Sequence, residues 1–206
     1  MRAFATLLAG LALSLTLAAC QKNGTNAVTA DDMSLGNANA KVTVIEYASV
    51  SCPHCARWNE EVWPAFKTKY VDTGRVHYVM REALTGEPSI AAAGFLMARC
   101  AGKDKYFQVV DAVYHNLKDM ETSGQPKPIL QRIAQSAGLS EQQFSECVSD
   151  QKAQEALVKR WETYVQRDKI TGTPTFIING KSHDGEMTLA DLDAAIAAAE
   201  TGKPAS

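Results

Sequence analysis

The sequence lacks the features that would place it in several specialised classes of protein. Its formal net charge is only −2, so it has no basic footprint of the kind that nucleic-acid-binding domains carry. It contains neither an internal repeat nor a long low-complexity tract. What remains is a chain of 206 residues, 46% hydrophobic and 21% charged, which is typical of one globular domain with room for an insertion.

The first 19 residues have the pattern of a signal peptide. Met1-Arg2 gives a positive start, and residues 3–19 are apolar apart from small hydroxyl side chains. The apolar run is slightly short for a permanent transmembrane helix. It ends in Leu17-Ala18-Ala19-Cys20, which resembles the lipobox of bacterial lipoproteins, where the cysteine is acylated and becomes the mature N-terminus. We expect lipid on Cys20; the alternative is an ordinary cleaved signal peptide that ends near a cysteine.

The number of cysteines fits an exported protein. Disulfides persist in the compartments into which proteins are exported. An odd number of cysteines, here five, needs an explanation in such a protein. If Cys20 carries lipid, two pairs remain, namely Cys52 with Cys55 and Cys100 with Cys147. We expect the second pair to form a structural disulfide, with two buried free thiols as the alternative.

The pattern of apolar residues predicts a mixed sheet interrupted by helices. The expected strands are 41–48, 75–80, 175–178 and, after the Asn179-Gly180 turn, 181–183. The expected helices are 56–70 and 189–199, with a block of helical spacing over 88–168. A strand–helix–strand start requires a parallel crossover, and the late hairpin adds antiparallel strands. We expect the apolar stripes of the helical block to form a core of its own.

The motif Cys52-Pro53-His54-Cys55 lies between a predicted strand and a predicted helix. A Cys-x-x-Cys pair can be half of a zinc site, a structural disulfide or a redox pair, and this place in the chain favours the redox pair. Zinc would need two further ligands at compatible spacing, which Cys100 and Cys147 do not offer. We therefore expect no metal and no bound cofactor.

The place of Cys52 at a helix start predicts an acidic thiol. Free backbone N–H groups and the positive end of the helix dipole favour a thiolate there, and Pro53 suits the first helical turn. His54 can stabilise the anion further; a passive exposed histidine is the alternative. Cys55 lies one turn on, where we expect it to be sheltered behind Cys52 and to act as the resolving thiol.

A second motif, Gly172-Thr173-Pro174-Thr175-Phe176, precedes the predicted hairpin. A proline at this point cannot donate to a strand ladder. A cis Thr173–Pro174 bond would leave the preceding backbone groups free for an incoming peptide, which could pair as an extra strand beside Cys52. A trans proline that merely opens a strand is the alternative.

Together these motifs resemble DsbA-type thiol–disulfide oxidoreductases. The resemblance rests on residues 46–55, on the helical block and on residues 171–180. It implies an α/β, thioredoxin-like fold with an inserted helical domain. The implied parts are a thioredoxin-like domain over 41–86 and 169–203 and the inserted helices over 87–168. They follow the lipidated N-terminus and linker over 20–40, which we expect from the lipobox-like motif and from the polar composition of residues 21–40.

The resemblance also bears on the direction of electron flow and on a buried acid. Cys-Pro-His-Cys is typical of the oxidising members, whereas Thr173 differs from the valine of the archetypal oxidase and is similar to the isomerase and reductase branches. Glu46 lies six residues before Cys52, on a strand expected to be central, where burial raises the pKa of a carboxyl. It could then pass a proton to and from Cys55; a solvated glutamate on an edge strand is the alternative.

The predicted function is donation of the Cys52–Cys55 disulfide to reduced exported polypeptides through a mixed disulfide. The resemblance implies reoxidation by a DsbB-like membrane quinone reductase. We expect a monomer in the periplasm of a Gram-negative bacterium, held at the membrane by lipid on Cys20. Two alternatives stay open, a disulfide reductase or isomerase that uses the same pair, and a copper-handling module that uses Cys52, Cys55 and His54.

Overall fold

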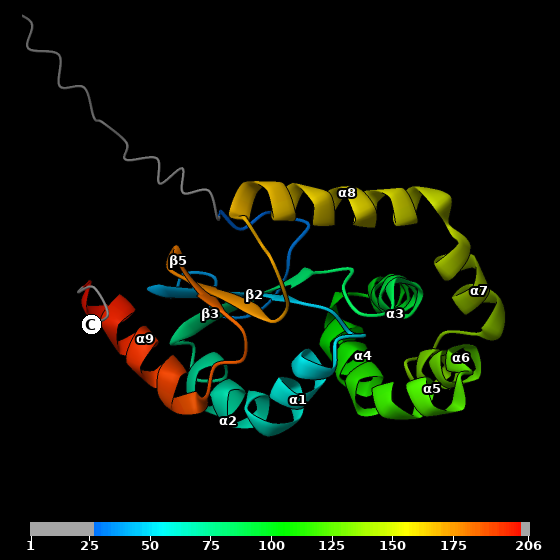
Figure 1. Cartoon of the computed structure of the whole chain (residues 1–206), viewed down its shortest axis with the longest axis horizontal. Coiled ribbons are helices and arrows are strands. Elements are labelled where there is room, and N and C mark those ends of the chain that lie inside the picture. Colours follow the sequence, from blue (N-terminus) through cyan, green and yellow to red (C-terminus); the bar gives the residue numbers. More distant parts are fainter. Residues whose placement is uncertain (1–26, 203–206) are drawn as a thin grey trace, which may run out of the picture.

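The computed structural model describes residues 27–202, so the predicted signal peptide and Cys20 lie outside the described residues. Five strands form one sheet in the order β1-β3-β2-β4-β5 (Figure 1). The strands are β1 (Met33–Gly36), β2 (Val42–Ala48), β3 (Val76–Glu82), β4 (Thr175–Ile178) and β5 (Lys181–Asp184). β2 and β3 are parallel, and the other neighbouring pairs are antiparallel. The predicted parallel crossover and late hairpin are both present.

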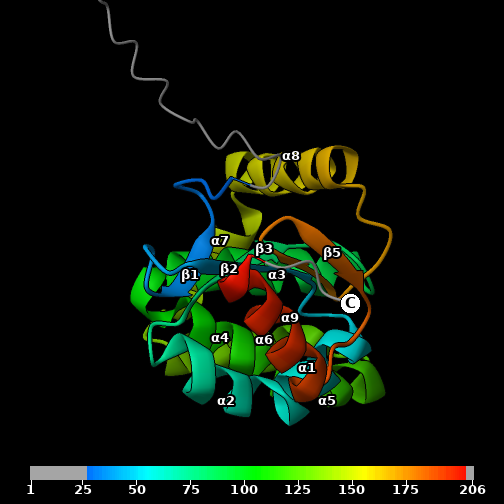
Figure 2. The ribbon, with the colours of Figure 1, turned by 90° about the vertical axis from the view of Figure 1, so that its left-hand side faces the viewer.

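Helices cover both faces of the sheet. The helical elements are α1 (Pro53–Glu61), α2 (Trp63–Phe66), the π-helical turn η1 (Lys67–Val71), α3 (Pro88–Cys100), α4 (Lys103–His115), α5 (Leu117–Ser123), α6 (Pro126–Ser136), α7 (Glu141–Ser149), α8 (Gln151–Asp168) and α9 (Leu189–Thr201). Figures 1 and 2 show α1, α2 and α9 on one face and α8 across the other. None of the helices within residues 27–202 combines the length and the apolar character that a membrane crossing requires.

One continuous apolar core joins the sheet to the inserted helices. It includes Phe176 from β4, Trp58 from α1, Val113 from α4 and Leu130 from α6. The expectation that the helical block has a core of its own is therefore wrong. The physical reason is that α4 packs against α1, so its apolar stripe faces the helix that carries Cys55.

The segment expected to be a linker contains a strand that was not predicted. β1 pairs antiparallel with β3, with Met33 opposite Met80 and Leu35 opposite Tyr78. Four residues that end in a glycine are too few to show an alternating pattern. Pairing with β3, which lies beyond the reach of any local pattern, makes this segment a strand.

Buried ion pairs hold together a smaller layer between the sheet and α8. Arg81 from β3 is fully buried, and its guanidinium pairs with Asp32 at 3.1 Å and with Asp168, the last residue of α8, at 3.2 Å. The hydroxyl of Tyr164 donates to Asp32 at 3.0 Å, and Arg81 donates to the hydroxyl of Tyr47 at 2.6 Å. Burial raises the pKa of Asp32, but the hydrogen bond from Arg81 and other donors outweigh it, and the pKa ends below its ordinary value.

Candidate active site

Cys52 lies where β2 passes into α1. The Cys52 N–H donates to the Ser49 carbonyl at 3.0 Å, which closes the turn before the helix. Cys52 is the N-cap and Pro53 the first residue of α1, so the helix begins earlier than the 56–70 range expected from the pattern. Both cysteines are thiols, with Cys52 6% exposed and Cys55 fully buried. The sheltered place predicted for Cys55 is present.

The surroundings of the two thiols move their pKa values in opposite directions. The pKa of Cys52 falls to about 5, with the largest contribution from a hydrogen bond with the Cys55 thiol, followed by Thr173 and the N–H groups of Cys55 and His54. Burial opposes this shift. The pKa of Cys55 rises well above its ordinary value, first because of burial and then because of Cys52. At neutral pH, Cys52 is therefore a thiolate and Cys55 a thiol.

The loop before β4 contacts Cys52 directly. The Thr173–Pro174 peptide bond is cis, and the Cys52 sulfur lies 3.4 Å from the Thr173 carbonyl oxygen. The Thr173 hydroxyl lies 2.6 Å from the hydroxyl of Thr85 in the loop between β3 and α3. The carbonyl of Thr85 in turn accepts from Ser51 at 2.7 Å. Three loops that are distant in sequence therefore meet around one sulfur atom.

Replacing Thr173 by valine should make Cys52 less acidic. The substitution keeps the backbone carbonyl but removes a hydroxyl that lowers the pKa of Cys52. A hydrogen bond to a charged group is worth about 1.5 kcal/mol or more, so we expect the acid dissociation constant of Cys52 to fall about tenfold. Thiolate absorbance across a pH titration of the reduced protein measures this. An unchanged titration curve would contradict the role given to the hydroxyl.

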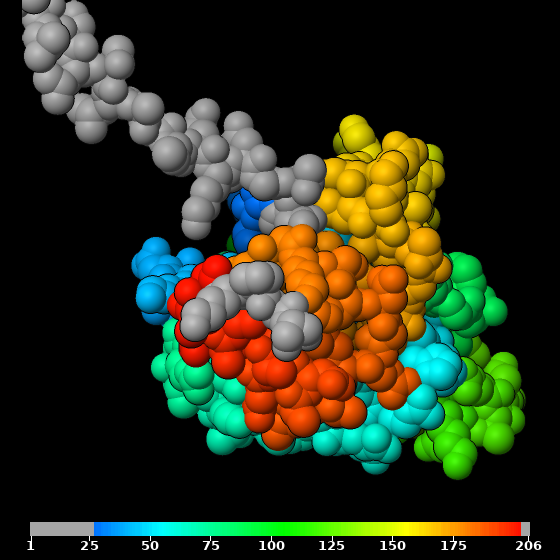
Figure 3. Space-filling model, turned by 60° about the vertical axis from the view of Figure 1, so that its left-hand side comes forward, coloured from blue at the N-terminus to red at the C-terminus, as the bar shows by residue number. Residues whose placement is uncertain are grey.

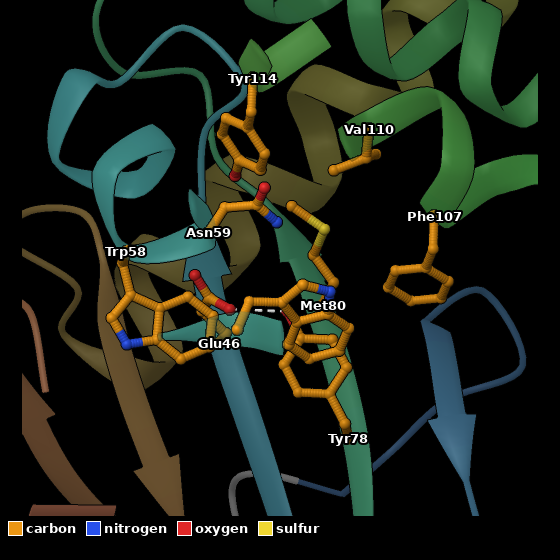
Figure 4. A pocket seen from close by; sticks show the side chains of 9 residues that line it. Glu46, Trp58, Asn59, Tyr78, Met80, Phe107, Val110 and Tyr114 are labelled. Carbon is orange, nitrogen blue, oxygen red and sulfur yellow. Dashed lines mark hydrogen bonds between the residues drawn. The ribbon is translucent and has the colours of Figure 1, made fainter. Parts of the chain in front are cut away.

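Glu46 is buried on the central strand, as predicted. It faces neighbours on both sides, with Met80 of β3 and Phe176 of β4 in register, and it is 2% exposed. Burial raises the pKa of Glu46 to about 8, although the Tyr78 hydroxyl, which donates to Oε2 at 2.6 Å, works against the rise. The charge of Cys52 raises the pKa further. Figure 4 shows the carboxyl and the Tyr78 hydroxyl joined by this hydrogen bond.

His54 is exposed and its imidazole meets a partner that the sequence did not suggest. Its Nδ1 lies 2.7 Å from Oε1 of Glu186, and Arg57 donates from Nε to Oε2 of the same carboxylate at 2.9 Å. Glu186 belongs to the loop between β5 and α9; Figure 3 shows this part of the chain (orange) at the surface beside the start of α1 (cyan). The hydrogen bond from Arg57 is the main reason why the pKa of Glu186 is lowered. Glu186 is 132 residues from His54, so no local pattern could have identified it.

Cys100 and Cys147 form a disulfide that joins α3 to α7, with an S–S distance of 2.05 Å.

Among residues 27–202, no group of three or more His, Cys, Asp or Glu side chains is placed to hold a metal ion. A cavity of about 20 Å³ lies beside Glu46. It has room for a water molecule and not for an organic cofactor.

Comparison with known proteins identifies the class. A family model described as Thioredoxin matches residues 28–198, which is most of the chain. The chain therefore belongs to the thioredoxin family.

Within that family the chain is DsbA-like. A Rickettsia bellii protein assigned by inference as a protein-disulfide oxidoreductase is 33% identical over 151 residues, which are 73% of this chain and 58% of the relative. The chain thus spans little more than half the length of the curated relatives it matches first. The crystal structure of Wolbachia pipientis alpha-DsbA1 is 26% identical with a TM-score of 0.75, and the alignment covers 85% of this chain and 96% of that one.

A more distant structure shares the fold. BdbD from Bacillus subtilis, in its oxidised form, has a TM-score of 0.74 at 19% identity, over 83% of this chain and 94% of that one. The predicted α/β, thioredoxin-like fold with an inserted helical domain is confirmed, and so is the predicted resemblance to DsbA-type proteins.

Proposed function

We propose that the chain is a thiol–disulfide oxidoreductase that donates the Cys52–Cys55 disulfide to exported polypeptides. The observation that carries this proposal is the geometry of the pair, with Cys52 at the N-cap of α1 beside the cis Thr173–Pro174 bond and Cys55 buried behind it, and this geometry shifts the two pKa values in opposite directions. A thiolate at Cys52 stabilises the reduced protein, since each unit by which its pKa lies below the surrounding pH contributes about 1.4 kcal/mol. The disulfide form is correspondingly easy to reduce, and it passes its disulfide on.

The proposed reaction has two exchange steps. A substrate thiolate attacks the sulfur of Cys52, the Cys52–Cys55 bond breaks, and a substrate–Cys52 disulfide forms while Cys55 leaves as a thiolate and takes up a proton. A second substrate thiolate then attacks the substrate sulfur of this mixed disulfide, and Cys52 leaves as a thiolate. The substrate has lost two electrons, which the two cysteines have gained.

The groups around the pair have supporting roles in this proposal. Glu46, whose pKa is about 8, gives its proton to the departing Cys55 thiolate and takes it back on reoxidation. The Thr173 carbonyl lies 3.4 Å from the Cys52 sulfur, so a peptide joined to Cys52 would run along Thr173 and Pro174. The disulfide between Cys100 and Cys147 is assigned a structural role in the insert.

The reduction potential of the Cys52–Cys55 couple tests the direction. We expect a value above about −150 mV in equilibrium with glutathione, and a value below about −230 mV would identify a reductase. Titration of the reduced protein should place the pKa of Cys52 at about 5. The rate at which the protein oxidises a dithiol peptide, compared with the rate at which it reduces insulin, also distinguishes an oxidase from a reductase.

A disulfide isomerase or reductase is the second candidate. Thr173 favours it, because the sequence resemblance associates threonine at this position with those branches. The dithiol peptide and insulin assays separate the two candidates.

The remaining proposals concern where the protein works and which molecules it meets there. We propose that the protein is exported, carries lipid on Cys20, works as a monomer and is reoxidised by a DsbB-like membrane quinone reductase. The DsbA-like relatives support export, and the Leu17–Cys20 motif supports the lipid. Mass analysis of Cys20 in the mature protein tests the anchor.

A further inference from the structure

The loop between β3 and α3 is fastened to the turn that leads into Cys52. The carbonyl of Thr85 in this loop accepts hydrogen bonds from the hydroxyls of Ser49 at 2.8 Å and of Ser51 at 2.7 Å. The next residue, Gly86, lies so close to the turn that a Cβ there would be 2.3 Å from the Ser51 carbonyl oxygen. Because the backbone is held in this way, the point from which the Thr85 side chain leaves the loop is fixed relative to Cys52.

Among residues 27–202, the Thr85 hydroxyl has one hydrogen-bond partner, the hydroxyl of Thr173 at 2.6 Å. A hydroxyl carries a single proton, so one of the two donates to the other and then has no proton left for a third group. The two possible directions differ in what they leave for Cys52. If Thr85 donates, the proton of Thr173 is free to reach the Cys52 sulfur. If Thr173 donates, its proton is taken up by Thr85.

The negative charge of Cys52 favours the first direction. Thr173 lies beside Cys52, and its carbonyl oxygen is 3.4 Å from the sulfur. The Thr173 side chain is among the groups that lower the pKa of Cys52, and a hydroxyl lowers the pKa of a thiol by donating to the thiolate. A proton that Thr173 gives to the sulfur is not available to Thr85. Thr85 must therefore be the donor within the pair of hydroxyls.

We propose that Thr85 is a positioning residue, whose hydroxyl donates to Thr173 and thereby directs the Thr173 proton to the Cys52 thiolate. In its consequence for disulfide exchange the proposal rests on the proposed function. A hydroxyl that already accepts a hydrogen bond is a stronger donor, and its own proton is held in one of about three staggered directions. Both effects strengthen the hydrogen bond to the thiolate, which exists only in the reduced protein. Thr85 therefore favours the reduced form.

Thr85→Val should make Cys52 less acidic. Valine keeps the backbone carbonyl and the branched shape but lacks the hydroxyl, so the Thr173 proton can point in about three directions in place of one. We expect the acid dissociation constant of Cys52 to fall about threefold. The titratable groups that interact with Cys52 are Cys55 and Glu46, and the substitution leaves both in place. Thiolate absorbance across a pH titration of the reduced protein measures the change, and an unchanged curve would overturn the proposal.

A second background and two control variants separate this role from a general effect on packing. In Thr173→Val the hydroxyl that Thr85 directs is absent, so adding Thr85→Val should have no further effect on Cys52. Thr85→Ser keeps the donor and should titrate as the parent does. Thr73→Val removes a hydroxyl that donates to the Lys69 carbonyl at 2.8 Å, before the start of β3, and should leave Cys52 unchanged. A threefold fall in the Thr173→Val background, or in Thr85→Ser, would overturn the proposal.

Equilibrium with glutathione extends the test to the redox couple. Because only the reduced protein loses the strengthened hydrogen bond, the ratio of reduced to oxidised Thr85→Val should be about threefold lower than that of the parent at pH 7 and the same glutathione ratio. This expectation compares variant with parent, so it holds for an oxidase and for a reductase alike. A parent potential in the reductase range would overturn the direction given in the proposed function and not the threefold change. A parent-like ratio in Thr85→Val would overturn the role of Thr85 alone.

Discussion

Replacing Cys55 by serine should abolish turnover and leave Cys52 covalently joined to its substrates. Without Cys55 the protein has no Cys52–Cys55 disulfide to donate, and the buried thiol directly behind Cys52, whose attack on a mixed disulfide would be intramolecular, is also lost. Well-placed intramolecular groups act at effective concentrations that no free thiol reaches, so we expect turnover to fall by at least about 10³-fold. Serine keeps an O–H donor for the Cys52 thiolate, and Cys52 therefore stays acidic and reactive. The Cys52 thiolate of the variant can attack a disulfide of an exported protein and form a mixed disulfide, with the other sulfur of that protein released as a thiolate, and electrophoresis without reductant should show these adducts.

The matched control is Cys52→Ser. It leaves the buried thiol of Cys55, whose pKa lies well above its ordinary value and which is shielded from substrate. This variant should give neither turnover nor adducts. Adducts at Cys55, or residual turnover in Cys55→Ser above about a hundredth of the parent, would contradict the division of roles between the two cysteines.

Replacing Arg81 by methionine should lower the free energy of unfolding by about 3–5 kcal/mol. Arg81, Asp32 and Asp168 have side chains with no exposed surface, so removing the guanidinium leaves the buried Asp32 carboxylate without its counter-charge and leaves Asp168 with Arg167 alone. Urea unfolding of the two proteins measures the difference. Arg75→Met is the matched control, since Arg75 pairs with Glu200 at the surface, where such a pair is worth at most about 1 kcal/mol.

The effect of Arg81→Met should depend on pH in a defined direction. The pKa of Asp32 is lowered in the folded parent, so its contribution to stability is present above the ordinary value of 3.8 and is lost as the pH falls through the folded value. Without Arg81, burial is opposed only by the hydrogen bonds from Thr29 and Tyr164, so the pKa of Asp32 is higher than in the parent and protonation relieves the variant on acidification. The difference in the free energy of unfolding between the parent and Arg81→Met should therefore become smaller as the pH is lowered from about 7 to about 4. If this difference instead became larger at low pH, the pairing of Arg81 with Asp32 and Asp168 would not stabilise the protein through charge.

Local sequence patterns could identify the residues whose chemistry follows from their position relative to a predicted strand or helix start. Cys52 and Cys55 were predictable because a strand followed by a helix start fixes where their sulfur atoms lie, and Glu46 because its strand is apolar on both sides. Pro174 was predictable because a proline before a strand is unusual. The fold followed from the order of these elements, together with the resemblance to DsbA-type proteins.

What escaped prediction depends on contacts between distant parts of the chain. Thr85 and Glu186 reach the active site from loops that carry no pattern of their own. The largest contribution to the acidity of Cys52 also came from an unexpected group, the Cys55 thiol, where the sequence pointed to the helix start and to the His54 side chain.

The short strand β1 limits how far the chain can be trimmed. It is the outermost strand on its side of the sheet, and it occupies the backbone edge of β3 from His77 to Met80. A shortened protein that starts after Gly36 would lose both this cover and Asp32. The bare N–H and C=O groups of β3 would then be open to strands of other molecules, which is a route to aggregation. Recombinant versions should therefore keep everything from residue 27 onward.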